Sequence, residues 1–279
     1  MKENPTLRLL NQRASLRVYD KRGISQETLD QILQAMMRAP TAGNQMLYSV
    51  IVVRDDATKQ KLAQSCDHQA FIATAPVLLI FLADHQRWFD YYQQNDVAGY
   101  CDRQGLRFEA PQESDLLLAI EDAMIAAQNA VIAAESLGIG SCYIGDIMEN
   151  YEFHCELFDL PDWAFPIGML CLGYYRENHL KKLRPRFEQQ YIVFDEKYRH
   201  LSADEYEQMF AEFFFAESLS CGQLCAGVLC QKNRICLQQG DGALCQSGYE
   251  TVGWAFAQSK SAGKEINCII IKINTDCIL

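Results

Sequence analysis

The segment 115–137 constrains the fold most, because it is long and consists largely of small apolar side chains. Its apolar residues recur at helical spacing: Leu117, Ile120, Met124, Ala127, Val131 and Ala134. Gly138 follows, and glycine often closes a helix in a left-handed conformation. We therefore predict one long helix over 115–137. Its small residues let another helix approach closely, as in the centre of a domain or the core of a dimer.

Short apolar runs predict buried strands at 48–53, 77–83 and 163–174, and a short strand and turn at 141–147. Runs this uniform are typical of strands covered on both faces. Ser25 is a suitable N-cap for a helix over 25–38 that ends before Pro40. We predict further helices at 55–65, 149–158 and 204–214, a turn at 71–74, and helical fragments with loops over 86–114.

Composition limits the possible partners. The 279 residues, enough for one large domain or two small ones, carry a formal charge of −11. This charge argues against a nucleic-acid partner, because phosphate binding depends on clustered Lys and Arg. No apolar stretch follows Met1, and the apolar run 77–83 is far shorter than a membrane span. We expect a cytoplasmic protein with no membrane partner, in which any anion is held by a local basic cluster.

Such a cluster is visible near the start of the chain. Arg13, Ser15 and Arg17 occupy alternate positions, so in an extended segment their side chains share one face. Arginine offers a planar fork of donors suited to phosphate. A second pair, Arg184 and Arg186, flanks Pro185. A solvated charge cluster is the alternative, but two separated arginine pairs in an acidic chain favour one shared anion site.

The turn 40–45 has the composition of a ligand-facing loop. Pro40 fixes its backbone, Gly43 permits unusual torsion angles, and Thr41, Asn44 and Gln45 supply polar side chains. An asparagine amide both donates and accepts, which suits the polar edge of an isoalloxazine or pyrimidine ring. A plain helix-to-strand loop is the alternative interpretation.

Glycine-spaced residues follow the long helix over 138–146 and include Tyr143, Ile144 and Gly145. They lack the strand-before-helix context of a dinucleotide fingerprint. Close approach of the backbone to a flat ligand is one interpretation, and an ordinary helix end followed by a strand is the other. His68 and Gln69, which precede Phe71, could reach the polyol or ring of such a ligand.

Residues for chemistry without a cofactor are not evident. The five histidines show no metal-ligand spacing such as HExxH, and neither a G-x-S-x-G elbow nor a Cys–His motif is present. We therefore predict no metal site and no catalytic side chain. If the chain is an enzyme, a cofactor carries the chemistry and the protein supplies position and electrostatics.

In combination, five motifs resemble those of the FMN-dependent nitroreductase family, most closely its NADPH-preferring flavin reductase and nitroreductase branch. They are RASLRVY at 13–19, APTAGNQ at 39–45, FIATAP at 71–76, AQNAVIAAESLGIGSCYIG at 127–145 and PIGMLCLGY at 166–174. Each motif alone is weak evidence for the family, but the five together are specific. The resemblance covers residues 6 to about 214.

The resemblance implies an α+β fold with a central mixed, mainly antiparallel sheet flanked by helices, in an FMN-binding domain over 1–215. It implies a homodimer with FMN at the subunit interface. The reaction would be ping-pong: NAD(P)H passes hydride to flavin N5, and a small nitroaromatic, quinone or flavin acceptor then takes it. A specialised reductase for one metabolite is an alternative within this fold. A flavin-binding or redox-sensing protein without efficient turnover is another.

Site residues follow from the resemblance position by position. The FMN phosphate and ribityl contacts would be Arg13, Ser15, Arg17, Arg184 and Arg186. The ring edge or polyol would meet Pro40, Thr41, Asn44, His68 and Gln69, and Tyr143, Ile144 and Gly145 would cover the isoalloxazine near N5. Asp146 departs from the pattern, since this branch often has a second glycine there. A carboxylate at that place could disfavour an anionic reduced flavin or alter substrate entry.

The tail 216–279 does not resemble a family ending. Seven of the twelve cysteines fall in the last 59 residues, without a CxxC pair, so zinc and iron–sulfur sites are poor explanations. The five earlier cysteines are scattered, as reduced thiols are. A one-nucleotide shift in permitted codons can yield a family-like ending. We therefore hypothesise that the tail is out of frame, after the run Phe213–Phe214–Phe215, and poorly ordered.

Overall fold

The computed structural model describes residues 4–215, 257–261 and 264–268. It divides into two compact units, Met1–Arg184 and Pro185–Leu279, which are described separately. The first unit contains the following elements: α1 (Pro5–Gln12), α2 (Gln26–Met37), η1 (Ala42–Asn44), β1 (Tyr48–Val53), α3 (Asp56–Ser65), α4 (Ala70–Thr74), β2 (Val77–Asp84), α5 (Gln86–Gln94), α6 (Val97–Arg103), α7 (Glu113–Ser136), β3 (Ile139–Ile144), η2 (Asp146–Met148), α8 (Tyr151–Leu157) and β4 (Ala164–Tyr174).

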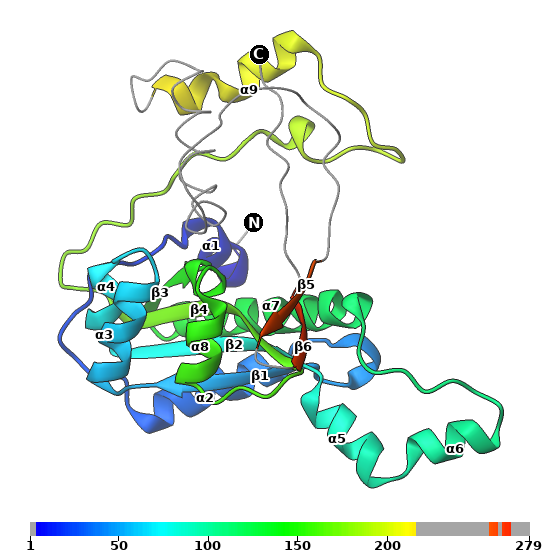
Figure 1. Ribbon diagram of the computed structural model, residues 1–279. Helices are drawn as coiled ribbons and strands as arrows, with labels where there is room; N and C mark the ends of the chain where they lie inside the picture. The colour runs from blue at the N-terminus through cyan, green and yellow to red at the C-terminus, as the bar shows by residue number, and fades with distance from the viewer. Residues whose placement is uncertain (1–3, 216–256, 262–263, 269–279) are drawn as a thin grey trace, which may run out of the picture. The chain divides into compact units, whose positions relative to one another are not determined.

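A four-stranded sheet in the order β1-β2-β4-β3 forms the centre of this unit (Figure 1). Each neighbouring pair is antiparallel, with a register shift between Phe81 and Leu82. A parallel contact comes from an isolated bridge between Ser15 and Ser141 at the β3 edge. The predicted α+β fold is therefore confirmed, and its mixed character is limited to this bridge among the described residues.

Helices cover both faces of the sheet (Figure 1). One hydrophobic cluster joins the sheet to α2 and α7, and a second joins its other face to α3, α4 and η2. All eight residues of β2 are buried, as predicted for a strand covered on both faces. At the sheet edge, β1 leaves Val52 36% exposed, so the same prediction holds less well there.

The long helix is confirmed as α7, which a capping box of Gln112 and Asp115 begins and Gly138, at φ 74°, follows. Its small residues pack against α2 and the sheet, and they include Ala119, Ala123, Ala126, Ala127, Ala130 and Ala134. Its other side exposes Leu117, Leu118, Met124 and Ile125. Among the described helices, α7 alone is long and apolar enough to span a membrane, a property shared by core helices that are largely buried.

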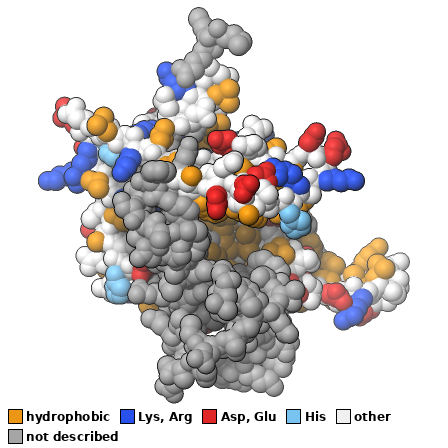
Figure 2. Space-filling view, turned by 90° about the horizontal axis from the view of Figure 1, so that it is seen from above, with side chains coloured by type: hydrophobic (Ala, Val, Ile, Leu, Met, Phe, Trp, Pro, Cys, Tyr) orange, Lys and Arg blue, Asp and Glu red, His pale blue; other side chains and the backbone are white. Residues whose placement is uncertain are grey.

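The predicted helical fragments over 86–114 are α5 and α6, which project as an arm from the rest of the first unit (Figure 1). Apolar and charged side chains lie together at the end of this arm in the view from above (Figure 2). The segment 71–74, predicted as a turn, belongs to the five-residue helix α4. The predicted helices at 25–38, 55–65 and 149–158 correspond to α2, α3 and α8.

The second unit contains η3 (Gln189–Tyr191), α9 (Ala203–Phe215), β5 (Ala257–Ser261) and β6 (Lys264–Cys268). The helix predicted at 204–214 is α9. An antiparallel pair, β5 and β6, falls within the tail, where no strand was predicted. Most of the tail, 216–256 and 269–279, lies outside the described residues. The predicted boundary at 215 and the out-of-frame hypothesis remain predictions.

Candidate functional site

The basic segment lies along the β3 edge. The backbone N–H of Leu16 donates to the Ser141 carbonyl at 2.8 Å, and the Leu16 side chain is buried. Ser15 and Arg17 are exposed and Arg13 is half-buried. The predicted alternation is confirmed, because β-type pairing turns the apolar residue inward and leaves the polar residues outward.

The positive charges of Arg13 and Arg17 affect the pKa values of two residues near the end of β3. Burial raises the pKa of the Cys142 thiol, and the positive charges of Arg17 and Arg13 oppose that rise. Burial likewise raises the pKa of Tyr143, against the charge of Arg13. The Arg17 guanidinium also lies 5.7 Å from the centroid of the Phe71 ring. Neither arginine forms an ion pair with any residue in the described part of the chain.

A cavity of about 380 Å³ opens beside Arg17. Three of the residues that line it are cationic, namely Arg17, Lys21 and Arg176, and one is acidic, Asp20. The Arg176 Nε–H donates to the Tyr19 carbonyl at 2.9 Å, which fixes that guanidinium at the cavity wall. An excess of positive charge around an open volume suits an anionic ligand such as a phosphate group. Neither Lys21 nor Arg176 was predicted as a site residue from the sequence.

Gly145, at the end of β3, leaves space for a ligand. A Cβ built at this glycine would meet nothing within 4 Å, so packing in the described chain does not require glycine there. Ile144 is buried and Tyr143 is half-buried, and the Tyr143 hydroxyl has no hydrogen-bond partner. The open space at Gly145 leaves room for a flat ligand, which stays one of the two interpretations of the glycine spacing.

The Gln69 side chain already donates a hydrogen bond to a carboxylate. Its Nε2 donates to Asp146 Oδ2 at 2.5 Å and to the Cys66 carbonyl at 3.1 Å, which leaves Oε1 to accept a hydrogen bond. His68 is exposed, with φ 53°. If Gln69 contacts a ligand, as the resemblance implies, its Oε1 is the group that remains for this contact, and it can only accept a hydrogen bond.

Asp146 also faces other acidic groups. Burial raises the pKa of the Glu149 carboxyl, with added contributions from the charges of Asp146 and Asp67 and from a hydrogen bond to Asp146. Asp146 stood out in the sequence, whereas Glu149 was not predicted as a site residue. Glu149 could have been predicted from its short spacing to Asp146, which is about one helical turn.

The Glu149 carboxyl gives a pH prediction. Its pKa in the folded state lies above the usual 4.5, so between those two values the folded protein binds more protons than the unfolded chain. Stability from this group is lost as pH rises through that window.

We expect Glu149→Gln to raise the melting temperature at pH 8 and to leave it unchanged below pH 4.5. Melting curves at several pH values measure this. The matched control is Glu152→Gln, an exposed glutamate of α8, and an equal gain at all pH values contradicts the prediction.

The turn 40–45 is a loop with an unusual backbone, and its contact with a ligand stays a prediction. Gly43, Asn44 and Met46 all have positive φ, at 55°, 58° and 53°. Thr41 Oγ1 accepts from the Met46 N–H at 3.2 Å, so the threonine helps to close the turn. Pro40 and Asn44 are exposed, and the Asn44 amide makes no hydrogen bond within the described residues. That amide is available to a ligand.

Asp122 of α7 holds the turn from below. This carboxylate is 2% exposed and accepts from the Ala42 N–H at 2.9 Å and from the Leu47 N–H at 3.2 Å. Such charged hydrogen bonds fix the backbone on both sides of the left-handed residues. This role of Asp122 was not predicted from the sequence. An acidic residue within the alanine-rich face of the helix was the available signal.

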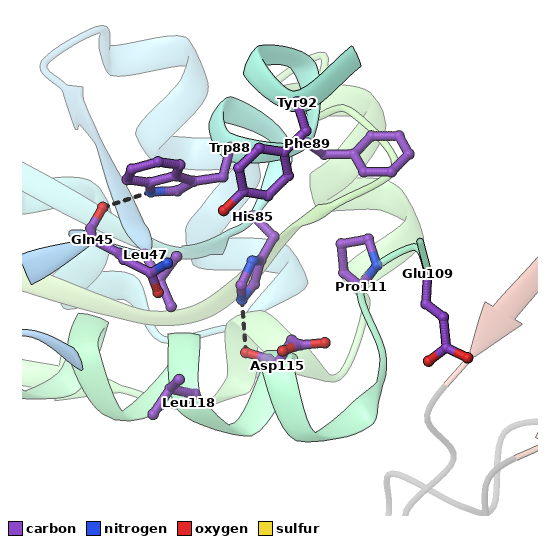
Figure 3. Close-up of a pocket in the computed structure, with 10 residues that line it drawn as sticks. All are labelled: Gln45, Leu47, His85, Trp88, Phe89, Tyr92, Glu109, Pro111, Asp115 and Leu118. Atoms are coloured by element: carbon purple, nitrogen blue, oxygen red, sulfur yellow. Dashed lines mark hydrogen bonds between the residues drawn. The ribbon is translucent and has the colours of Figure 1, made fainter. Parts of the chain in front are cut away.

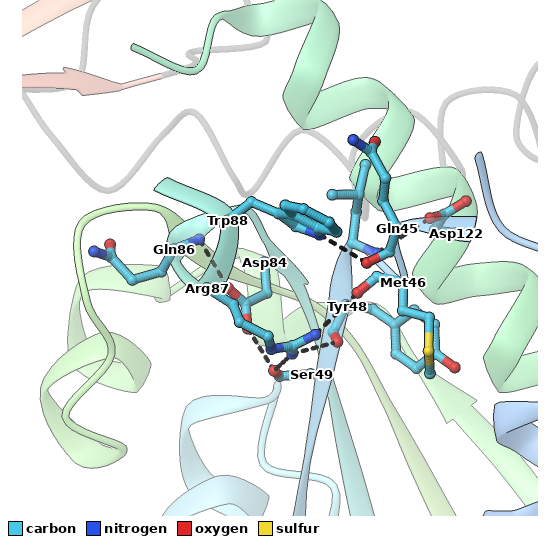
Figure 4. Close-up of polar contacts among 10 residues, drawn as sticks. Gln45, Met46, Tyr48, Ser49, Asp84, Gln86, Arg87, Trp88 and Asp122 are labelled. Carbon is cyan, nitrogen blue, oxygen red and sulfur yellow. Dashed lines mark hydrogen bonds and ion pairs between the residues drawn. The ribbon is translucent and has the colours of Figure 1, made fainter. Parts of the chain in front are cut away.

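Arg87 and Trp88 of α5 hold the turn from the other side (Figure 4). The Arg87 guanidinium donates to the Met46 carbonyl at 3.2 Å and the Tyr48 carbonyl at 3.1 Å, and it pairs with Asp84. Trp88 Nε1–H donates to the Gln45 carbonyl at 2.8 Å. The turn is thus held by α5 and α7 together.

One chain does not bring the two halves of the predicted site together. The turn leads into β1, whereas Arg13–Arg17 lies along β3, and these strands form opposite edges of the sheet. Gln69 and Gly145, joined through Asp146, belong to the β3 side. Arg184 ends the first unit and Arg186 lies in the second, both exposed. Their part in the anion site remains a prediction.

The four-stranded antiparallel sheet between two helical layers is a nitroreductase-type α+β fold, because solved proteins of that class superimpose on it. The model of the nitroreductase family matches residues 10–174. The chain belongs to the nitroreductase family. No group of His, Cys, Asp or Glu that could hold a metal occurs among the described residues.

Relatives cover most of the chain. It is 33% identical over 204 residues to an FMN reductase [NAD(P)H] of Bacillus subtilis, covering 72% of this chain and 77% of that protein. It is 28% identical to an oxygen-insensitive NADPH nitroreductase of Salmonella typhimurium, covering 76% and 83%. The solved NADPH:FMN oxidoreductase of Vibrio harveyi, complexed with NAD+, superimposes with a TM-score of 0.70 at 26% identity, covering 81% of this chain and 92% of that one.

Proposed function

We propose that this protein is an FMN-dependent oxidoreductase that passes hydride from NAD(P)H to nitroaromatic, quinone or flavin acceptors. The observation that carries the proposal is the pair Arg13 and Arg17: neither has an ion-pair partner among the described residues, and Arg17 lines a cationic cavity of about 380 Å³. In a chain with net charge −11, such a pair needs an anionic ligand. Relatives named as an FMN reductase and an NADPH nitroreductase support FMN and a nicotinamide donor.

The residues fit FMN. Arg13, Ser15 and Arg17 would bind the phosphate, with Arg184 and Arg186 as proposed additions. The Gln69 Oε1 would accept from a ligand N–H or hydroxyl, since both of its amide hydrogens are used. Bound FMN would supply the atom that takes up and releases hydride. The protein would position the ring against the open backbone at Gly145 and stabilise charge through its N–H groups and nearby cations.

A homodimer would complete the site. The Pro40, Thr41 and Asn44 turn lies at the sheet edge opposite the basic segment, so a second copy would supply it to the ring. The exposed apolar side chains Leu117 and Met124 of α7 would be covered in the same assembly. We propose that this assembly is cytoplasmic and takes small-molecule acceptors.

The test is an absorbance spectrum of the purified chain, followed by titration with NADPH and with NADH. We expect a yellow protein that bleaches with one nicotinamide and recovers its colour with nitrofurazone. Bleaching without recovery would indicate a flavin binder without turnover. A colourless protein that takes up no FMN contradicts the proposal.

Asp146→Asn is expected to make the reduction potential of bound FMN more positive. The carboxylate adds negative charge beside Gly145 and Gln69, which opposes the charge that the cofactor gains on reduction. About 1.4 kcal/mol in a two-electron couple corresponds to about 30 mV, so we expect a shift of tens of millivolts. Spectroelectrochemical titration measures it, with the exposed Asp159→Asn as control. An unchanged potential contradicts the role given to Asp146.

A further inference from the structure

A second cavity, of about 180 Å³, lies between α5 and the start of α7 (Figure 3). Three of its walls are the aromatic side chains Trp88, Phe89 and Tyr92, and a fourth is His85. None of these four side chains is fully buried, although three are large and apolar. Aromatic side chains left partly open around a cavity are typical of a ligand site.

Hydrogen bonds fix the walls before any ligand arrives (Figure 3). Trp88 Nε1–H donates to the Gln45 carbonyl at 2.8 Å, which sets the plane of the indole. His85 Nε2 lies 3.0 Å from the Asp115 carbonyl, and a carbonyl only accepts, so this nitrogen carries the hydrogen. Walls held in this way lose little conformational entropy when a ligand binds.

The volume sets the size of the ligand. Pockets for drug-sized molecules occupy about 300–1,000 Å³, whereas an apolar cavity of about 150 Å³ is enough for benzene. At about 180 Å³, the cavity accommodates one substituted ring. A dinucleotide or a second flavin is too large for it.

Charge sets the ligand class. The acidic residues Glu109 and Asp115 line the cavity, and no Lys or Arg among the described residues does so. Arg87 is directed to the Met46 and Tyr48 carbonyls, and Arg107 neutralises Glu109 in an exposed ion pair. The Asp115 carboxylate, which has no ion pair among the described residues, therefore supplies the net negative charge of the lining. Aromatic faces attract cations, tryptophan most strongly. An anionic ring compound would be opposed by the carboxylates.

We propose that this cavity is a binding site for a single-ring aromatic cation. The site is formed by the rings of Trp88, Phe89 and Tyr92 with the carboxylate of Asp115, and it is lined by residues other than those of the cationic cavity beside Arg17. It adds a ligand class that FMN binding does not explain. The proposal does not depend on which acceptor the enzyme reduces.

The test is calorimetric titration of the purified full chain with benzyltrimethylammonium, with tryptophan fluorescence as a second signal. Benzyl alcohol and benzoate serve as neutral and anionic probes of similar size. We expect saturable binding of the cation, weaker binding of the alcohol and none of benzoate. Equal affinity for all three probes, or no saturable heat with the cation, would overturn the proposal.

Variants locate the site. Asp115→Asn is expected to weaken cation binding by about three-fold, as for loss of one partly exposed charge, while Glu113→Gln, a nearby glutamate outside the lining, should leave it unchanged. Trp88→Phe should reduce the fluorescence response and weaken the calorimetric affinity. Unchanged affinity in both Asp115→Asn and Trp88→Phe contradicts the assignment. The flavin spectrum, recorded on the same samples, reports the proposed FMN site separately.

Discussion

Replacing both Arg13 and Arg17 by alanine is expected to weaken FMN binding by about a thousandfold. A hydrogen bond to a charged group contributes roughly 1.5–3 kcal/mol, and each 1.4 kcal/mol is tenfold in affinity. Two such groups on one phosphate therefore account for a loss of this size. Neither side chain has an ion-pair partner among the described residues, so the fold should be little affected. Quenching of FMN fluorescence on binding measures the dissociation constant.

The matched control for this pair is Arg8→Ala, which removes an exposed arginine of α1 outside the proposed site. It should change neither FMN affinity nor melting temperature. Circular dichroism of the double variant must match the parent protein for the comparison to hold. An unchanged dissociation constant in a folded double variant would remove the basic segment from the phosphate site.

Asp122→Ala is expected to lower the free energy of unfolding by about 3–5 kcal/mol. The buried carboxylate accepts from the Ala42 and Leu47 N–H groups, and both donors would lose their partner. A buried unsatisfied polar group costs roughly 1–3 kcal/mol, and each bond here is to a charge. Because these bonds hold the left-handed turn at Gly43 and Asn44, activity should fall with stability.

Urea unfolding measures this loss. Glu121→Ala, at the exposed neighbouring position of α7, is the control and should change stability by less than about 0.5 kcal/mol. Asp122→Asn keeps one acceptor oxygen and should fall between the parent and Asp122→Ala. Full stability in Asp122→Ala would show that water or another group replaces the carboxylate.

Much of the fold was predictable because local patterns determine it. The strand 48–53 agrees with β1 at both ends, and Ser25 and Asp55 cap the helices they precede. The alternation of Arg13, Ser15 and Arg17 also holds, because pairing with β3 imposes a period of two.

The unpredicted features depend on contacts between distant positions. Asp122 meets Ala42 across 80 positions, and Gln69 meets Asp146 across 77. A local sequence pattern cannot reveal contacts between positions so far apart in the chain. The family resemblance assigns the basic segment and the polar turn to one cofactor, but it does not show that they lie at opposite edges of the sheet, since that depends on the strand order.

We propose that the tail beyond Phe215 arises from a shift of the reading frame. Its crowded cysteines and its lack of family motifs support this, together with the phenylalanine run whose codons are rich in T. Resequencing the gene across these codons tests it. An unchanged frame, with the same cysteine-rich ending in close homologues, would refute the proposal.

The opposite placement of the basic segment and the polar turn makes each proposed site composite. A single chain would carry the basic segment of one site and the polar turn of another, at opposite edges of its sheet. A complete FMN pocket would exist only where two chains meet. Cofactor retention would then depend on protein concentration: dilution that separates the chains would release flavin and abolish turnover in the same step. The equilibrium between separate chains and the dimer would therefore determine both flavin binding and turnover.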